Sequence, residues 1–440
     1  MSSAHRAGPA ASVVRRPSAD AVTALTGFLV LLFAIPSRLV VGPLGGAGSP
    51  AQLLGVAALL WWAAFRLARR GRSPMRQPVR WAMSIFAVTI LLSYIAATVR
   101  AIDDVELRAA DRGVLMLLSW LGIVLLACDG IPSRERLDVL LRRLALAGGG
   151  IAVLGLAQFF TGASFVNYIQ VPGLSQNADL GVVASRDGFS RPAGTALHPI
   201  EYGIVLTMIL PIAMHYALRD KHRSPLRRWW PVAALGMAVP VSISRSAILC
   251  SVVVLATMLP TWPRRLRRRA YVAIVALLAV VFVAIPGIIG TLVGLFTGIG
   301  GDSSAESRTG SYALAAEFIE RAPVFGRGFQ TFLPQYRILD NQFLLSTIET
   351  GVVGVLALIG LFAAGAVTAR RVRLLSPDES TRSLGQALTA AVLAGGASFA
   401  LFDALSFPQV AGLVMLTVGL AAAALRITVE GDMQSPDPPT

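Results

Sequence analysis

Residues 229–263, WWPVAALGMAVPVSISRSAILCSVVVLATMLPTWP, decide the fold class. This run of 35 residues is apolar except for an interruption at Ser244, Arg245 and Ser246. As one helix it would extend about 52 Å, far more than the roughly 30 Å of a bilayer core. Arginines flank both of its ends, and cytoplasmic segments of membrane proteins are enriched in them. The run therefore predicts a hairpin of two short membrane helices with Arg245 at the tip, below the outer surface.

The remainder of the chain has the same apolar character. Of the 440 residues, 55% are hydrophobic and only 14% are charged, which excludes a string of soluble domains. We predict an all-α polytopic membrane protein with about twelve transmembrane helices, because each apolar run apart from the two hairpin arms is close to the ~20 residues of a span. These runs begin at Ala21, Ala51, Trp81, Gly113, Leu144, Ile200, Pro231, Ser246, Tyr271, Phe343, Leu384 and Gln409.

The net charge of +15 reflects membrane orientation rather than nucleic-acid binding. If the amino terminus is cytoplasmic, the segments on the inner side hold 28 of the 39 basic residues. We therefore expect a cytoplasmic tail at 1–20, a membrane domain at 21–426 and a disordered cytoplasmic tail at 427–440, with an uncleaved first span. No nucleic-acid partner is expected.

Two long segments are predicted on the outer side, at 161–197 and at 298–340, the second between the ninth and tenth helices. Long loops between membrane helices commonly carry function. Within the second, Arg308–Arg321 places Tyr312, Ala315, Ala316 and Ile319 at helical spacing, which predicts an amphipathic helix on the membrane surface. The charged outer segment at 100–112 has mixed signs and is interpreted as a solvated turn.

Arg245 is the first candidate for a functional residue. An arginine at that depth costs several kcal/mol unless it has a partner or a water-filled cavity. Its guanidinium can hold two phosphate oxygens, which favours the headgroup of a lipid carrier as its ligand. The alternative is a structural arginine bound by carbonyl groups or by an acid such as Asp403.

A second candidate cluster lies in SRPAGTALHPIEYG, residues 190–203, where the sixth helix is expected to begin. Arg191 could be a second phosphate contact, or it could form a salt bridge with Asp187. His198 precedes a proline, which suits the start of a helix. Neither residue is specific to one role in isolation.

The third cluster is Asp340 and Asn341, followed after nine residues by Gly351 and Gly354. Asp340 could cap the helix or act as general base toward a sugar hydroxyl. The glycines are most simply explained by close helix packing. Glu349 is a weaker candidate, since an internal hydrogen bond explains it equally well.

Cysteine usage gives no sign of a cofactor or a disulfide framework. Cys128 and Cys250 both lie in predicted helices, without metal-ligand spacing, and are expected to be small core residues. No metal and no cofactor is predicted.

Several of these motifs together resemble the O-antigen ligase and polymerase superfamily of bacterial membrane glycosyltransferases. The resemblance rests on the Arg191 segment, on Ser-Arg-Ser at Arg245, on ERAPVFGRGFQTF at 320–332 and on DNQFLLSTIETGVVG at 340–354. The family's ligases carry a histidine followed by Asn, Ser or Gln, nine residues and Gly-x-x-Gly. This chain keeps the spacing but has Asp340 in place of the histidine.

The resemblance implies a site on the extracytoplasmic face of the bacterial inner membrane. Arg191 and Arg245 would hold the diphosphate of a polyprenyl-linked oligosaccharide, and Asp340 would orient or deprotonate the acceptor hydroxyl. Arg308, His198 and Asn341 would be auxiliary contacts. The implied partners are the lipid-linked oligosaccharide, a glycan or lipid acceptor, the membrane and other polysaccharide assembly proteins.

Three function classes remain open from the sequence. The first is an enzyme, either a polymerase of surface polysaccharide repeats or an O-antigen-type ligase, and Asp340 in place of histidine tilts the prediction toward the polymerase. The second is a twelve-helix secondary transporter, which is disfavoured because the ionisable residues cluster at the outer edge instead of the midplane. The third is a scaffold for envelope assembly.

Overall fold

The chain is helical throughout most of the residues that the computed structural model describes, which are 20–68, 77–177, 184–186, 188–297 and 303–434. Each of the twelve predicted apolar runs begins within a helix. The helices are α1 (Ala21–Ala34), α2 (Pro50–Ala68), α3 (Pro78–Val99), α4 (Asp104–Gly130), α5 (Arg134–Thr161), α6 (Pro199–Arg219), α7 (Pro225–Val241), α8 (Arg245–Met258), α9 (Arg264–Ala284), α10 (Ile288–Thr297), α11 (Ser303–Arg321), α12 (Gln342–Leu375), α13 (Glu379–Ser398) and α14 (Pro408–Gln434).

The structure confirms an all-α membrane architecture. Among the described residues, seven helices are long and apolar enough to cross a bilayer, or eight if the bent pair α9 and α10 is one span. The other four predicted spans fall on α1, α7, α8 and α13, which are shorter or less apolar. The number twelve therefore remains a prediction. The seven clear spans are α2, α3, α4, α5, α6, α12 and α14.

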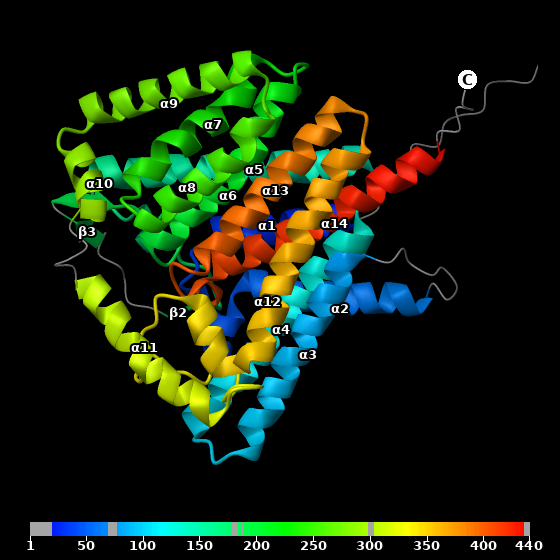
Figure 1. Cartoon of the computed structure of the whole chain (residues 1–440), viewed down its shortest axis with the longest axis vertical. Helices are drawn as coiled ribbons and strands as arrows, with labels where there is room; N and C mark the ends of the chain where they lie inside the picture. Colours follow the sequence, from blue (N-terminus) through cyan, green and yellow to red (C-terminus); the bar gives the residue numbers. More distant parts are fainter. Residues whose placement is uncertain (1–19, 69–76, 178–183, 187, 298–302, 435–440) are drawn as a thin grey trace, which may run out of the picture.

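The ninth predicted span is not one straight helix. The chain bends by 116° between α9 and α10, and the break contains Pro286 and Gly287. Proline cannot donate the helical hydrogen bond, and Gly287 has a φ of 88°, in the left-handed region that favours glycine. α9 packs little against the remainder of the protein and lies at the edge of the bundle (Figure 1).

The core of the bundle forms around α14, which is the most deeply buried of the clear spans. Small residues let its neighbours approach closely: a Cβ added at Gly419 would lie 2.8 Å from the Cβ of Ala127 on α4. Cys128 and Cys250 are buried free cysteines, as predicted. α14 continues to Gln434, so the first part of the tail predicted to be disordered from residue 427 is helical.

The loops gather at two ends of the bundle, and which end faces outward remains a prediction. At one end, Arg142 pairs with Asp220 at 2.9 Å. At the other, which we call the outer end, Arg38 donates to Asn167 at 2.6 Å. Two short antiparallel sheets also lie in the outer loops: β1 (Leu39–Val40) with β2 (Ser175–Gln176), and β3 (Ala184–Arg186) with β4 (Phe189–Arg191).

Candidate functional site

The chain reverses between α7 and α8, as the predicted hairpin requires. A Cβ added at Gly203, near the start of α6, would meet Ala247 at 2.7 Å and Ser242 at 2.9 Å, so both sides of the turn lie at that end of α6. Ile243 in the turn has a φ of 46°, and the Ser244 side chain caps α8. The arms are 17 and 14 residues long, close to the predicted length.

Arg245 is the first residue of α8 and is half-buried. The start of α8 packs beside Gly203, which lies five residues inside α6 from His198, or about 7 Å along the helix. The hairpin tip that carries Arg245 therefore packs more than one helical turn inside the start of α6.

His198 begins α6, in agreement with the helix-start interpretation. Its Nδ1 accepts a hydrogen bond from the backbone N–H of Ile200 at 3.2 Å, and its ring centroid lies 6.4 Å from that of Phe407. Burial, with a contribution from the nearby charge of Arg191, lowers the pKa of His198 to about 4. Because Nδ1 is committed to the cap, any substrate contact would use Nε2. The alternative Arg191 partner, Asp187, lies outside the described residues.

Asp340 is not the cap of α12, contrary to one of the two predicted roles. The cap is Asn341, whose Oδ1 accepts from the backbone N–H of Leu344 at 3.2 Å. The next residue, Gln342, ties this end of α12 to the α13–α14 connection: its backbone N–H donates to the carbonyl of Phe399 at 2.7 Å. The predicted auxiliary residue Asn341 thus has a structural task.

This anchoring brings Asp403 of the α13–α14 connection close to Asp340. Burial raises the pKa of Asp403 to about 6, and the negative charge of Asp340 contributes to the increase. Asp403 is the one charged residue between Arg382 and Arg426 in the sequence. The two carboxylates therefore interact electrostatically at the outer end.

The two motifs at 320–332 and 340–354 interlock. Gly351 has a φ of 68° and breaks α12, so the glycine serves this break and not simply close helix packing. The backbone groups that the break leaves without helical hydrogen bonds pair with the loop at 322–332. The N–H of Val352 donates to the carbonyl of Pro323 at 2.9 Å, and the N–H of Gly328 donates to the carbonyl of Glu349, also at 2.9 Å. A Cβ at Gly351 would lie 2.1 Å from the carbonyl oxygen of Val324.

A buried ion cluster holds the same loop from its other side. Glu106 on α4 is 2% exposed and is bound by Arg327, Arg100 and the hydroxyl of Tyr336. The segment at 100–112 is therefore not merely a solvated turn. The mixed charges were the visible signal, but two of the three partners of Glu106, Arg327 and Tyr336, lie more than two hundred positions away in the chain.

A polar cavity of about 320 Å³ opens beside these residues, and we call it the outer cavity. Glu349 lines it, although the residue is only 1% exposed. Its Oε1 accepts from the backbone N–H of Phe332 at 3.3 Å, and its Oε2 has no hydrogen-bond partner among the described residues. The other polar groups on the wall come from Arg112, Gln330, Gln335, Arg337, Asp403 and Ser406.

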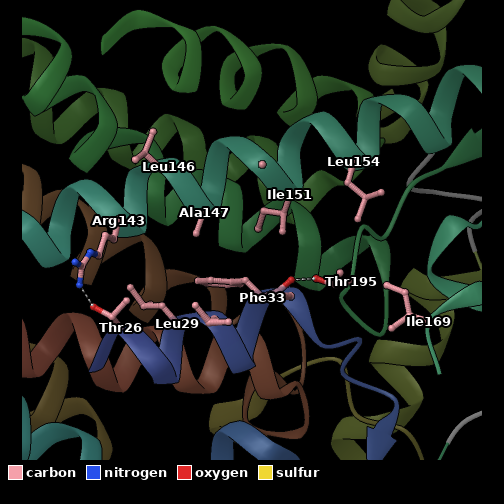
Figure 2. A pocket seen from close by; sticks show the side chains of 13 residues that line it. Thr26, Leu29, Phe33, Arg143, Leu146, Ala147, Ile151, Leu154, Ile169 and Thr195 are labelled. Carbon is pink, nitrogen blue, oxygen red and sulfur yellow. Dashed lines mark hydrogen bonds between the residues drawn. The ribbon is translucent and has the colours of Figure 1, made fainter. Parts of the chain in front are cut away.

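A second cavity, of about 460 Å³, lies between α1 and α5 (Figure 2). Leu29 and Phe33 of α1 face Ala147 and Ile151 of α5 across it. Its lining is almost wholly apolar, so it offers hydrocarbon contact and little chemistry. Within the described ranges, no group of three or more His, Cys, Asp or Glu side chains could hold a metal ion.

The predicted helix exists as α11, but its packed face matches the predicted one only in part: Ala315 and Ile319 lie on it, whereas Tyr312 and Ala316 are exposed. Ala315 is buried, whereas Tyr312 is 56% exposed. The apolar side instead uses Leu314, Ala315, Phe318 and Ile319, which pack against Phe332 and Leu339. Figure 1 shows α11 beside the outer part of α12. The side chain of Arg308 lies outside the described residues.

Comparison with known proteins agrees with the motifs. The O-antigen ligase family model matches residues 230–359. The match confirms the predicted resemblance to the O-antigen ligase and polymerase superfamily and supports a glycan-transferring membrane enzyme. It includes Arg245 and both interlocking motifs, whereas Arg191 and Asp403 lie outside it.

Other comparisons add less. No curated protein matches this chain. One matching solved structure is a chain from work on polymerization and crosslinking by a peptidoglycan synthase complex. It is 17% identical, covers 79% of this chain and 97% of that chain, and has a TM-score of 0.41. Similarity at this level identifies neither a shared site nor a shared activity.

The sequence motifs of the O-antigen ligase family account for only part of this site. The structure brings Asp340 close to Asp403 and Arg191 close to His198. Sequence reasoning considered Asp403 only as a partner of Arg245, although its isolation in an apolar stretch was a usable signal. It ranked Glu349 low because the cavity beside that residue is formed by distant segments.

Proposed function

We propose that this chain is a metal-independent glycosyltransferase on the extracytoplasmic face of a bacterial inner membrane. It polymerises polyprenyl-diphosphate-linked oligosaccharide repeats of a surface polysaccharide. The observation that carries the proposal is the recessed Arg245 at the tip of a short hairpin, at the same end of the bundle as Arg191, His198 and Asp340. A guanidinium fork at this depth suits the two oxygens of a lipid phosphate.

The reaction needs a base and a stabilised leaving group. Asp340 accepts the proton of the acceptor hydroxyl while the oxygen of that hydroxyl forms a bond to the anomeric carbon of the donor. The bond from that carbon to the phosphate oxygen breaks, and the electron pair leaves with the polyprenyl diphosphate. Arg191 and Arg245 stabilise the charge that develops on the leaving group, so the configuration inverts without a metal.

Arg245→Ala is the direct test of this assignment. We expect the variant to reach the membrane and to lose glycan chain growth, because the diphosphate loses a bidentate partner. Arg227→Ala is the matched control, since Arg227 is an exposed arginine on the opposite flank of the same hairpin. Glycan length profiles of cells carrying each variant give the measurement, and normal chain length with Arg245→Ala would disprove the assignment.

Ligation is a second candidate function, favoured by the description of the matching family as O-antigen ligase. A ligase would use the same arginines and the same base but would transfer the glycan once, to a lipid or other acceptor. A ladder of products indicates a polymerase. A single transfer that depends on an added acceptor indicates a ligase. Other polysaccharide assembly proteins would be partners in either case.

A further inference from the structure

Two buried glutamates of the outer end, Glu201 and Glu349, differ in how their oxygens are used. Glu201 on α6 is 0% exposed, and its two carboxylate oxygens accept from the backbone N–H groups of Leu197 at 2.7 Å and Gln409 at 2.6 Å. It joins the start of α6 to the start of α14 and has a complete structural explanation.

Glu349 has only half of such an explanation. Its Oε1 accepts from the backbone N–H of Phe332, and the backbone N–H of Gln330 also interacts with the carboxylate, but Oε2 has no hydrogen-bond partner among the described residues. The side chain lines the outer cavity. A buried carboxylate oxygen without a donor is costly, which makes this atom a candidate ligand group.

We propose that the outer cavity binds the acceptor sugar, with Glu349 Oε2 accepting a hydrogen bond from a hydroxyl beside the one that reacts. This inference rests on the proposed glycosyl transfer. It assigns Glu349 as a positioning residue, because the proton and the anomeric bond are handled at Asp340.

The wall of the cavity has the chemistry of a sugar site. Arg112 and Arg337 supply donors, Asp403 supplies a second carboxylate, and the ring of Phe332 supplies an apolar surface. The volume of about 320 Å³ lies at the lower end of the roughly 300–1,000 Å³ of ligand pockets, which suits one ring of a longer glycan.

The cavity also adjoins the proposed base. Asp403 on the wall experiences the charge of Asp340, and Leu339, the residue before Asp340, lines the same space. A pKa of about 6 for Asp403 leaves its carboxylate largely ionised at neutral pH, ready to accept a hydrogen bond from a second hydroxyl. An acceptor bound here would present a neighbouring hydroxyl toward Asp340.

The test measures how the enzyme discriminates between acceptors. The donor is a polyprenyl-diphosphate oligosaccharide, and the acceptors are a fluorescent octyl glycoside of the same repeat and analogues that each lack one hydroxyl of the terminal sugar. One analogue lacks a hydroxyl beside the reacting position. With wild-type protein, we expect its kcat/KM to be lower than that of the complete acceptor by about tenfold or more.

Glu349→Gln replaces the Oε2 acceptor with a donor and keeps an oxygen for Phe332. In this variant we expect a higher KM for the complete acceptor. The discrimination ratio, which is the kcat/KM of the complete acceptor divided by that of the same analogue, should be near one. Glu201→Gln is the matched control and should keep the wild-type ratio. If Glu349→Gln fails to fold, Asp403→Asn is compared with wild type in the same way. We expect this variant to lose discrimination against an analogue that lacks a different hydroxyl.

Two results separate the possible failures. If wild-type protein transfers glycan but the variants retain its full discrimination among the analogues, the acceptor site is wrong and the proposed function stands. If wild-type protein releases no polyprenyl diphosphate with any acceptor, the proposed function itself fails, and this inference fails with it.

Discussion

His198 and Asp403 lie at the outer end of the bundle, and burial shifts their pKa values in opposite directions. The pKa of His198 falls from 6.5 to about 4, and that of Asp403 rises from 3.8 to about 6. Between about pH 4 and pH 6, folding therefore releases a proton at the imidazole and takes one up at the carboxyl. As pH rises through this interval, His198 increases the free energy of unfolding and Asp403 decreases it, so the two effects oppose each other.

Single substitutions should separate these two effects. We expect Asp403→Asn to make thermal stability rise more steeply with pH between about 4 and 6, because the effect of His198 then acts alone. His198→Asn, which can still cap α6, should make stability fall over the same interval. The measurement is the apparent Tm in detergent, with differences on the order of a few degrees. Unchanged slopes in both variants would contradict the assigned environments.

Prediction from sequence works best for residues whose own neighbours restrict them. Arg245 interrupts a long apolar run with arginines at both ends, so its place at a hairpin tip follows from helix length and charge. Asp340 and Asn341 are adjacent, and only the backbone direction at the start of α12 decides that Asn341 is the cap. The nearness of Asp403 to Asp340 arises from tertiary packing, for which the local sequence carries no pattern.

The break in α12 at Gly351 is the feature that joins two sequence motifs into one structure. The helix of 34 residues would be about 51 Å long, and the break separates an outer part carrying Glu349 from a part of membrane-spanning length. The loop at 322–332 satisfies the backbone groups freed by the break.

Gly351→Ala should therefore destabilise the protein strongly. The left-handed φ costs about 1–3 kcal/mol for a residue with a side chain, and the added Cβ would also lie 2.1 Å from the carbonyl oxygen of Val324. Gly360→Ala is the control on the same helix, because a Cβ there meets nothing within 4 Å. We expect a lower Tm for the first variant and an equal or slightly higher one for the second. Equal Tm values for both variants would refute the interlock.

The other elements show where periodicity and length stop being informative. The hairpin of α7 and α8 follows from the length of its apolar run and from its charged flanks. The face that α11 buries is offset from the predicted one, because Phe318 packs against Phe332 and lies in the same apolar cluster as Leu339. The bend between α9 and α10 depends on Pro286 and Gly287. The sequence on both sides of these residues is apolar, so hydropathy alone does not indicate the bend.

At the scale of the whole molecule, the two ends of the bundle differ in the loops they gather, and charge predicts which end faces the cytoplasm. Tyr168 lies in the outer loop at 161–197 and is 84% exposed, and Lys221 is exposed in a loop at the opposite end. The native cysteines are buried and should not react.

Thiol labelling can test this orientation. An impermeant reagent should modify Tyr168→Cys from the extracytoplasmic side of intact membranes, and Lys221→Cys only after permeabilisation. The native Cys128 and Cys250 provide a silent background. The reverse order of labelling would place the candidate site on the cytoplasmic face and would contradict the proposed reaction.

The central claim is that the outer end of this protein transfers a glycan from a polyprenyl diphosphate. Its most direct measurement uses the protein purified in detergent with a polyprenyl-diphosphate oligosaccharide, and follows released polyprenyl diphosphate together with longer glycans. We predict both products with wild type and with Arg227→Ala, and a loss of at least about a hundredfold with Arg245→Ala and Asp340→Asn. Release that is equal in all four proteins, or absent from wild type, would contradict the account.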